Sequence, residues 1–309
     1  LPISVIELKN PADENATIED AYNQLQTYKD EIEGLFRTNG FLVTSDGLQA
    51  RIGSLTANEE RFMAWRTVDG ENIVSKGVPE LETLINGVFD KSRLLSLLRG
   101  FIIFENTGSG IIKKLAGYHQ FQAVHKAVQC TIKATDESGD NRVGVIWHTQ
   151  GSGKTALAYY SVKYLTHNFK FKKILPKFYF IVDRIDLMNQ AKDEFESRGL
   201  KVNLIDTKKN LLNDFSKAQV IKNLSGKLEI TVVNIQKFLD DTVPIEKTDY
   251  NIANQRIYFL DEVHRSYNPK GSFLANLFNS DRDAYLIGLT GTPLIKKNIK
   301  TREIFGDYI

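Results

Sequence analysis

The pattern of apolar and polar positions divides the chain into two parts of different character. The N-terminal third mixes short strand-like runs, at residues 3–8 and 40–44, with helical stretches near residues 17–36 and 78–98. Thr17 and Asp20 have the spacing of a capping box, which predicts where the first helix begins. In the second helical stretch, apolar side chains recur at the spacing of one helix face. These patterns predict a mixed α/β region.

The second part contains continuous apolar runs separated by longer amphipathic or polar stretches. The runs cover residues 143–147, 178–182, 230–235, 257–260 and 285–289. Apolar strands that alternate with helices are typical of a parallel sheet buried on both faces. Because ligands bind at the carboxyl ends of such strands, we expect the chemistry directly after each run. A change to Asn, Thr, Gly and Ser near residue 105 predicts a linker at 105–117, between domains at 1–104 and 118–309.

Composition agrees with two globular domains. The chain has 309 residues, 42% hydrophobic and 25% charged, with a formal net charge of only +2, so the local distribution of charge must decide whether nucleic acid is a partner. A single cysteine, Cys130, excludes an intrachain disulfide and a cysteine-based zinc site. No apolar run approaches a membrane span, and no signal peptide opens the chain, so we expect a cytoplasmic protein without a membrane partner.

A glycine-rich loop follows the first apolar run of the second part. Glycines let backbone N–H groups turn inward on phosphates, while Lys154 can reach the β- and γ-phosphates and the Thr155 hydroxyl can bind Mg²⁺. His148 stands where such loops usually begin with glycine. A helical pattern follows directly, which favours a nucleotide-binding loop over an ordinary turn. The residues expected to bind nucleotide here are Gly151, Ser152, Gly153, Lys154 and Thr155.

Two further motifs follow later apolar runs. Asp261 and Glu262 come directly after residues 257–260, where one carboxylate can hold Mg²⁺ and the second can orient or deprotonate water. T-G-T-P follows the run at 285–289 and by itself is an ordinary turn. Together, G-S-G-K-T, D-E-V-H and T-G-T-P resemble motifs I, II and III of superfamily 2 helicases and translocases. The resemblance implies that His264, Thr290, Gly291 and Thr292 couple the nucleotide state to DNA.

Other segments resemble further motifs of that family. Gln120 resembles the residue that reads adenine, although Gln122 is close enough to be the alternative. Arg184, in V-D-R after the second run, and residues 231–237 resemble DNA-contact motifs. The interval from Thr155 to Val182 contains lysines and aromatic residues but no acidic residue. Such a stretch can meet a phosphate backbone, and a solvated surface is the alternative.

An acidic and a basic residue stand close together near the N-terminus. Glu7 and Lys9 share one side of a strand, because side chains on a strand repeat every two residues. Such a pair can hold Mg²⁺ and stabilise charge in a nuclease, although alternating charge on a surface strand also explains it. In the next helix, Gln24 and Tyr28 share one face at i and i+4. E-x-K followed by Q-x-x-x-Y resembles the RecB-like branch of the PD-(D/E)xK nucleases.

The whole arrangement resembles the R subunit of type I restriction-modification enzymes, on W-H-T-Q-G-S-G-K-T, V-D-R-x-D-L, L-D-E-V-H-R-S and L-T-G-T-P together with the N-terminal motifs. The resemblance implies an incomplete nuclease domain at 1–104 and a first RecA-like parallel-sheet P-loop domain at 118–309. It assigns nuclease catalysis to Glu7, Lys9, Gln24 and Tyr28, and ATP hydrolysis to Lys154, Thr155, Asp261 and Glu262.

The resemblance also implies cofactors, partners and missing parts. ATP and Mg²⁺ are the cofactors, with Glu7, Thr155 and Asp261 as metal ligands, and duplex DNA and the methylation and specificity subunits are the partners. A first metal-binding Asp should precede Glu7 by more residues than are present, and a second RecA-like domain should follow Ile309. Both ends therefore look cut from a longer chain. The alternatives are a helicase or remodeller without nuclease activity, and a nucleotide-binding assembly module.

Overall fold

A computed structural model describes residues 1–13, 15–75, 77–134, 142–149, 151, 153–217, 227–235, 254–262, 273–291 and 306–309. The chain folds into two compact units, residues 1–122 and 123–309. Each unit has its own sheet and its own buried side chains.

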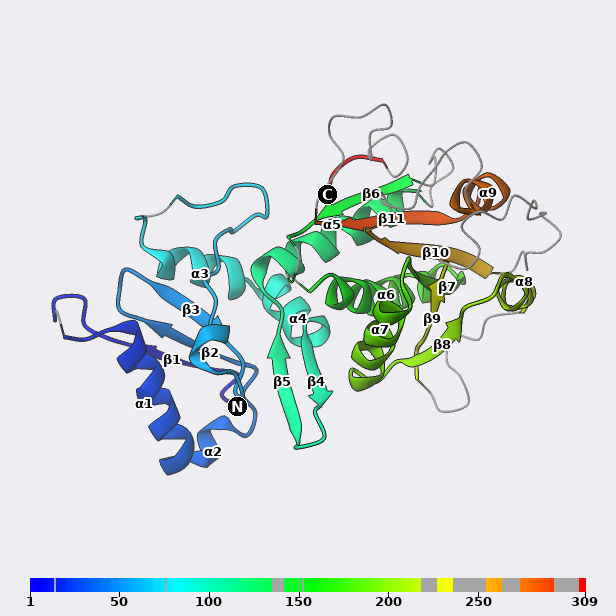
Figure 1. Ribbon diagram of the computed structural model, residues 1–309. Coiled ribbons are helices and arrows are strands. Elements are labelled where there is room, and N and C mark those ends of the chain that lie inside the picture. The colour runs from blue at the N-terminus through cyan, green and yellow to red at the C-terminus, as the bar shows by residue number, and fades with distance from the viewer. Residues whose placement is uncertain are drawn as a thin grey trace. The chain divides into compact units, whose positions relative to one another are not determined.

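The first unit contains a three-stranded sheet of β1 (Ser4–Leu8), β2 (Phe41–Ser45) and β3 (Ala50–Gly53), in that order (Figure 1). β1 is parallel to β2, which is antiparallel to β3. The predicted capping box is confirmed, because the Thr17 side chain accepts a hydrogen bond from the Asp20 N–H and Asp20 bonds the Thr17 backbone in return. It begins α1 (Ile18–Glu31), which packs Leu25 against the sheet. The predicted helix at 17–36 ends early, and a short α2 (Glu33–Phe36) follows.

The remainder of the first unit differs from the expected pattern in two places. The helical stretch at 78–98 forms two helices, α3 (Glu80–Val88) and α4 (Lys91–Gly100), because Asp90 caps the second one. The expected linker at 105–117 contains much of an antiparallel hairpin of β4 (Ile102–Asn106) and β5 (Ile111–Leu115). The polar residues between these strands form its turn. A short η1 (Glu59–Arg61) completes the elements of this unit.

The second unit is built on a six-stranded sheet in the order β6-β11-β10-β7-β9-β8, with every neighbouring pair parallel (Figure 1). The division between the units lies within α5 (Tyr118–Ala134). The apolar runs predicted to be strands are confirmed as β6, β7, β9, β10 and β11. β8 was not predicted, because its residues are only partly buried at this edge of the sheet. The strands are β6 (Arg142–Trp147), β7 (Leu175–Val182), β8 (Lys201–Ile205), β9 (Glu229–Asn234), β10 (Asn254–Asp261) and β11 (Tyr285–Thr290).

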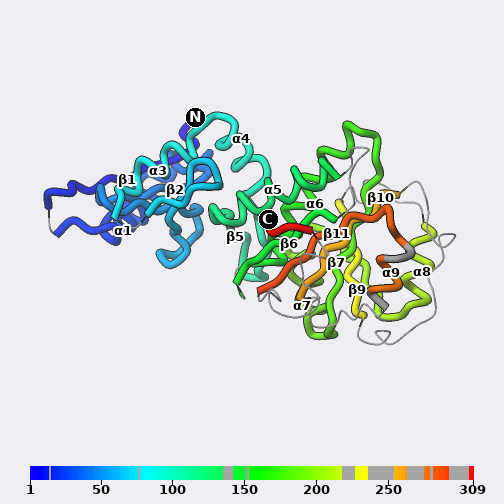
Figure 2. Tube along the Cα trace, turned by 90° about the horizontal axis from the view of Figure 1, so that it is seen from above, coloured from blue at the N-terminus to red at the C-terminus, as the bar shows by residue number. Residues whose placement is uncertain are grey.

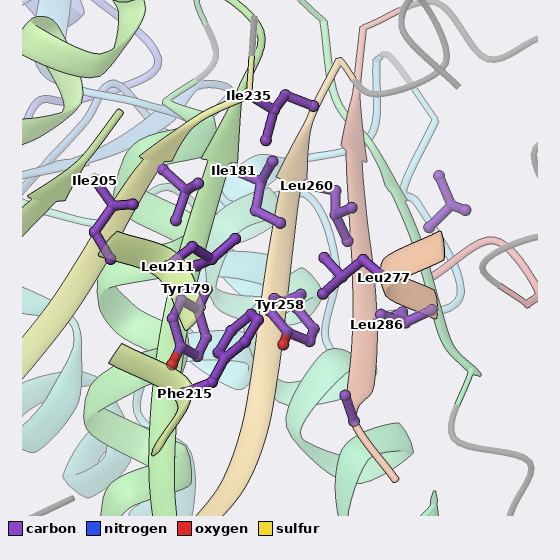
Figure 3. Packing of buried hydrophobic residues seen from close by; sticks show 13 residues of the cluster. Tyr179, Ile181, Ile205, Leu211, Phe215, Ile235, Tyr258, Leu260, Leu277 and Leu286 are labelled. Carbon is purple, nitrogen blue, oxygen red and sulfur yellow. The ribbon is translucent and has the colours of Figure 1, made fainter. Parts of the chain in front are cut away.

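Helices connect these strands, and alternate side chains of the strands contact different helices. Figure 2 follows the chain from β6 through α6 (Lys154–Phe171) into β7 and α7 (Ile185–Ser197). Phe180 of β7 contacts Phe195 of α7, with ring centroids 5.3 Å apart. Tyr179 points to the other face, where its ring centroid lies 5.4 Å from that of Phe215 in α8 (Lys208–Ser216). α9 (Phe273–Ser280) adds Leu277 to the same cluster (Figure 3).

Two buried ion pairs lie side by side near the amino ends of β7 and β10. Lys177 and Arg256 are opposite each other in the register, with Tyr179 and Tyr258 following two positions later. Arg256 donates to Asp281, 2.7 Å from Nη2 to Oδ1, and the Tyr258 hydroxyl donates to the same carboxylate at 2.8 Å. Both cations are about 95% buried. The Asp281 carboxylate therefore fastens the residue that directly follows α9 to the sheet.

Asp214 of α8 is the carboxylate partner of the other cation. Lys177 Nζ lies 3.1 Å from Asp214 Oδ2, and the Tyr179 hydroxyl donates to that oxygen at 2.9 Å. This position corrects the expectation that Lys177 belongs to a solvent-facing basic stretch. Its charge is used inside the protein and is not available to a phosphate backbone.

Asp281→Ala should lower the free energy of unfolding by about 3–5 kcal/mol, because it leaves the Arg256 charge buried without its partner. Urea unfolding at neutral pH measures the change. Lys201→Ala is a suitable control, since Lys201 is half exposed and pairs with Glu229 at 2.9 Å. Breaking that surface pair should cost less than about 1 kcal/mol. Similar losses for both variants would contradict a stabilising role for the buried network.

Candidate active site

The carboxyl ends of three neighbouring strands bring the predicted nucleotide motifs to one edge of the sheet. β11 lies between β6 and β10, with Thr290 opposite Trp147 and Leu289 opposite Asp261. The glycine-rich loop, Asp261 with Glu262, and Thr290 with Gly291 therefore all begin at the same edge. The expectation that the chemistry lies directly after the apolar runs is met in this unit.

The glycine-rich loop has the backbone conformation that its glycines allow. Gly151 and Gly153 have φ values of 80° and 84°, in the left-handed region that side chains with a Cβ rarely adopt. Gly153 is the N-cap of α6, so Lys154 and Thr155 occupy the first turn of that helix. The free N–H groups of a helix N-terminus favour phosphate. Ser152 lies outside the described residues.

Glu262 is held by hydrogen bonds to both of its carboxylate oxygens. Lys154 Nζ lies 2.5 Å from Glu262 Oε1, which also accepts the Gly291 N–H at 3.0 Å. The Thr290 hydroxyl donates to Oε2 at 3.1 Å. Although burial raises the pKa of Glu262, the bond and charge of Lys154, with the Gly291 and Thr290 bonds, outweigh burial and lower it. The Glu262 carboxylate is therefore ionised, and both of its oxygens accept hydrogen bonds.

The backbone of Glu262 is itself unusual. Its φ of 49° places a non-glycine residue in the left-handed region, which costs free energy that surrounding contacts must offset. The Glu262 N–H donates to the Leu289 carbonyl at 2.9 Å, which holds the turn at the end of β10. Such strain is typical of positions where a side chain must point in a particular direction. The sequence contains no signal for it.

Asp261 has a buried carboxylate oxygen with no hydrogen-bond partner, Oδ1. Burial raises the pKa of this carboxyl to about 6; Lys154 opposes the rise, and the charges of Glu262 and Asp183 add to it. An orphaned buried oxygen is costly unless something satisfies it. A hard cation such as Mg²⁺ prefers oxygen ligands, so Asp261 fits as a Mg²⁺ ligand; the Thr155 hydroxyl, in the first turn of α6, is the second ligand that the sequence predicts.

Two residues that the sequence analysis did not single out for this role also hold the Thr290–Gly291 segment. Trp147 Nε1 lies 3.2 Å from the Gly291 carbonyl oxygen, and the His148 N–H donates to the Thr290 carbonyl at 3.0 Å. The indole is 54% exposed although it ends a buried strand. The end of β6 thus fixes the backbone that contacts Glu262.

The structure describes some of the other residues that were expected to contact nucleotide or DNA. Arg184 is the N-cap of α7, and its exposed guanidinium pairs with Asp186 at 3.3 Å. Gln120 lies in the first turn of α5, within the first unit, where its Oε1 accepts the Gly117 N–H at 3.2 Å. Gln122 lies against Gly70, so the choice between the two glutamines stays open. His264 and Thr292 lie outside the described residues.

The predicted basic and aromatic stretch does not form one surface. Phe169 and Phe178 are buried in the core, as is Lys177. Lys170, Lys172 and Phe171 are exposed at the C-terminal end of α6, which is the end remote from the glycine-rich loop. The solvated-face alternative therefore accounts for part of this stretch. Its contact with DNA stays a prediction.

In the first unit, Glu7 and Lys9 form the expected pair at the end of β1. Lys9 Nζ lies 3.1 Å from Glu7 Oε1, and both side chains are mostly buried. Glu7 is opposite Thr44 of the central strand. Hydrogen bonds from Thr17 lower the pKa of Asp20, and the nearby Lys9 charge adds to the effect, so Lys9 also lies near the start of α1.

Gln24 and Tyr28 lie on α1, where Tyr28 packs against the cluster around Leu25 and Leu42. Tyr28 therefore has a packing role in addition to any role in catalysis. Within the described part of the chain, no group of three His, Cys, Asp or Glu side chains is arranged to hold a metal ion. Glu7 by itself, already paired with Lys9, does not complete a Mg²⁺ site.

None of the helices in the described ranges has the length and apolar character needed to cross a membrane.

Family models match both units. A model of the SWI2/SNF2 ATPases matches residues 119–309, and a model of the N terminus of type I restriction enzyme R proteins matches residues 1–61. The first includes the glycine-rich loop, Asp261, Glu262 and the Thr290–Gly291 segment. The second includes Glu7, Lys9, Gln24 and Tyr28.

Named relatives agree with these matches. The type I restriction enzyme HindI endonuclease subunit of Haemophilus influenzae is 38% identical over 329 residues, covering 100% of this chain and 30% of the relative. A Methanocaldococcus jannaschii protein, named as the MjaIXP endonuclease subunit of such an enzyme, is 32% identical, with 100% and 30% covered. The chain thus spans about 30% of the length of these relatives.

A Sulfolobus solfataricus SWI2/SNF2 ATPase core in complex with double-stranded DNA is 16% identical, with 68% of this chain and 37% of that chain covered and a TM-score of 0.39. The resemblance read from the sequence motifs is confirmed by the family models and the named relatives. The chain belongs to the SWI2/SNF2 ATPase family, and residues 1–61, ahead of its ATPase region, match the N terminus of type I restriction enzyme R proteins.

Proposed function

We propose that the second unit binds ATP with Mg²⁺ and hydrolyses it. The observation that carries the proposal is the convergence of Lys154, Glu262 and the unsatisfied Asp261 oxygen at the carboxyl edge of one parallel sheet. Few structural roles require an orphaned carboxylate oxygen beside a lysine and a glycine-rich helix N-terminus. A phosphate ester bound with a divalent cation would satisfy the carboxylate oxygen, the lysine and the helix N-terminus together.

The residues divide the chemistry between them. The glycine-rich loop and the first turn of α6 bind phosphate oxygens through backbone N–H groups, and Lys154 adds a positive charge. The Thr155 hydroxyl and Asp261 would hold Mg²⁺, which neutralises charge on the phosphates. Glu262 orients the attacking water and accepts its proton. Thr290 and Gly291 keep the Glu262 carboxylate in place for that step.

In this proposal the ATPase moves duplex DNA for a type I restriction enzyme that also cuts it. Support comes from the relatives, which are named as endonuclease subunits of such enzymes, and from the match of residues 1–61. We propose double-stranded DNA and the methylation and specificity subunits as partners, and the cytoplasm as the location. Motor activity without nuclease activity, and a nucleotide-dependent assembly role, are the alternatives that the experiments below separate.

The first unit is proposed to contribute to DNA cleavage. The specific observation is the Glu7–Lys9 pair, mostly buried at the end of a strand whose next helix carries Gln24 and Tyr28. Lys9 is placed to stabilise negative charge that develops on a phosphate. Among the described residues, no group of three acidic, histidine or cysteine side chains is arranged to hold a metal ion here, so the role proposed for Lys9 is electrostatic.

Lys154→Ala should abolish ATP binding, because the first turn of α6 loses its positive charge toward phosphate. Isothermal titration with a non-hydrolysable ATP analogue and Mg²⁺ measures the affinity, which should fall at least about a hundredfold. Lys170→Ala, an exposed lysine at the other end of the same helix, should bind as the unchanged chain does. Tight binding by Lys154→Ala would refute the phosphate-loop assignment.

Mg²⁺-dependent nucleotide affinity should fall as the pH is lowered through about 6. Burial raises the pKa of Asp261, so the carboxyl is neutral below that pH and cannot ligate a cation. The fall should approach about tenfold per pH unit below the pKa. Titrations between pH 5 and 8, with Mg²⁺ and with EDTA, measure it. Asp261→Asn should remove the Mg²⁺-specific part of the pH dependence, and an unchanged profile in that variant would assign it to another group.

Glu7→Ala should abolish DNA cleavage while leaving ATP hydrolysis intact, because the carboxylate lies in the other unit. The assay uses the protein at the length of its relatives, assembled with its partner subunits, and cleavage should fall at least about a hundredfold. Glu19→Ala, an exposed acidic residue of α1, is the matched control. Unchanged cleavage by Glu7→Ala would contradict the assignment of cleavage to Glu7, and ATP hydrolysis without any cleavage by the unchanged protein favours a motor without nuclease activity. Assembly that survives Glu262→Gln with no loss of translocation favours the assembly module.

A further inference from the structure

Lys154 forms an ion pair with Glu262 in this structure. Its ammonium nitrogen lies 2.5 Å from Glu262 Oε1, and the side chains are only 10% and 16% exposed. An ion pair this far removed from solvent is much less screened than a surface pair. The proposed function requires the same ammonium group to bind phosphate. The inference below rests on that function.

Glu262 is engaged on both oxygens at the same time. Oε1 accepts bonds from Lys154 and Gly291, and Oε2 accepts a bond from Thr290. A carboxylate with these bonds has its negative charge largely satisfied, which makes it a poor acceptor for a proton from water. The strained Glu262 backbone, with φ of 49°, is stabilised by the same contacts. The observed arrangement is therefore a closed state of the site.

Phosphate and the Glu262 carboxylate compete for one lysine. A nucleotide phosphate brings several negative charges next to Glu262, so repulsion and competition act in the same direction. We propose that the Lys154–Glu262 pair is a closed latch that nucleotide must open: phosphate takes Lys154, and Glu262, released from the lysine but still held by Thr290 and Gly291, becomes able to accept a proton. Nucleotide binding then activates its own hydrolytic carboxylate.

The latch is connected to an exposed indole. Gly291 donates its N–H to Glu262, and its carbonyl accepts the Trp147 indole N–H. A change in the bonds of Glu262 therefore reaches Trp147 through one residue. The chain has two tryptophans, and the other, Trp65, is 1% exposed in the first unit. Trp65→Phe leaves Trp147 as the single fluorescent indole.

ADP affinity tests the latch without a hydrolysis step. Glu262→Gln should tighten ADP binding at least about tenfold, because ADP no longer has to break a charged pair. Thr290→Val keeps every charge and removes a bond that Glu262 has in both the closed and the open state, so it should change ADP affinity less than about twofold. Glu194→Gln is the matched control: its carboxylate also raises the pKa of Asp261 but pairs with Arg198. It should change ADP affinity less than about twofold.

The outcomes separate the latch from the proposed function. ADP binding by the unchanged chain, with no gain in Glu262→Gln, overturns the latch and leaves nucleotide binding intact. An equal gain in Glu194→Gln also overturns it, because general loss of negative charge then explains the effect. Absence of nucleotide binding by the unchanged chain overturns the proposed function and the latch together.

Fluorescence supplies a second measurement that does not depend on Thr290→Val folding correctly. In the Trp65→Phe background, saturating ADP should change the emission of Trp147. The change should be at least halved when Glu262→Gln is added, because the latch is then already open. Equal emission changes with and without Glu262→Gln would show that Trp147 senses nucleotide by another route, against the latch.

Discussion

The insertion of β11 between β6 and β10 is the constraint on which the candidate active site depends. All three strands are parallel, so their carboxyl ends lie at one edge, and residues more than a hundred positions apart meet there. β11 supplies Thr290 and Gly291 between the loop that follows β6 and the carboxylates that end β10. Without this middle strand, Lys154 and Glu262 would have no common support. The site is thus a property of strand order more than of any single motif.

Buried charged groups are paired differently at the two ends of the same sheet. Near the amino ends, Lys177 and Arg256 each have a carboxylate and a tyrosine hydroxyl completes each pair, so the buried charges are satisfied. At the carboxyl ends, one Asp261 oxygen has no partner and Glu262 has a strained backbone. Stability favours the first arrangement, and the second costs free energy. The unsatisfied Asp261 oxygen and the strained Glu262 backbone therefore indicate that a ligand is needed at the carboxyl ends.

The sequence predicted the elements whose signals are local. The capping box at Thr17, the buried apolar strands and the glycines with left-handed φ each depend on a few adjacent residues. β8, the β4–β5 hairpin and the break at Asp90 were not predicted, because partial burial and pairing decide them. The same limit affected the charges. The lysine-rich interval looked like one surface, but the fold directs Lys177 inward, which only tertiary structure determines.

The sequence likewise predicted some features of the candidate site and not others. Residue types and their spacing predicted Lys154, Asp261, Glu262 and Thr290, but no pattern predicted the conformation of Glu262 or the bond from Trp147. These features arise where separate strands meet, so they have no local signal. The predicted roles of Ser152, His264 and Thr292 fall outside the described residues. The domain limits at 104 and 118 remain predictions.

Both units contain a lysine paired with a glutamate, but the two pairs differ in how strongly they support a functional site. Glu7 and Lys9 are two residues apart on one strand, so any extended chain brings them near each other. Lys154 and Glu262 are 108 residues apart, and their contact requires the whole sheet to be formed. A local pair can arise without selection for a site, whereas a distant pair beside an orphaned carboxylate cannot arise so easily. The geometry therefore supports the ATPase assignment more strongly than the nuclease assignment, which depends mainly on the motifs and relatives of residues 1–61.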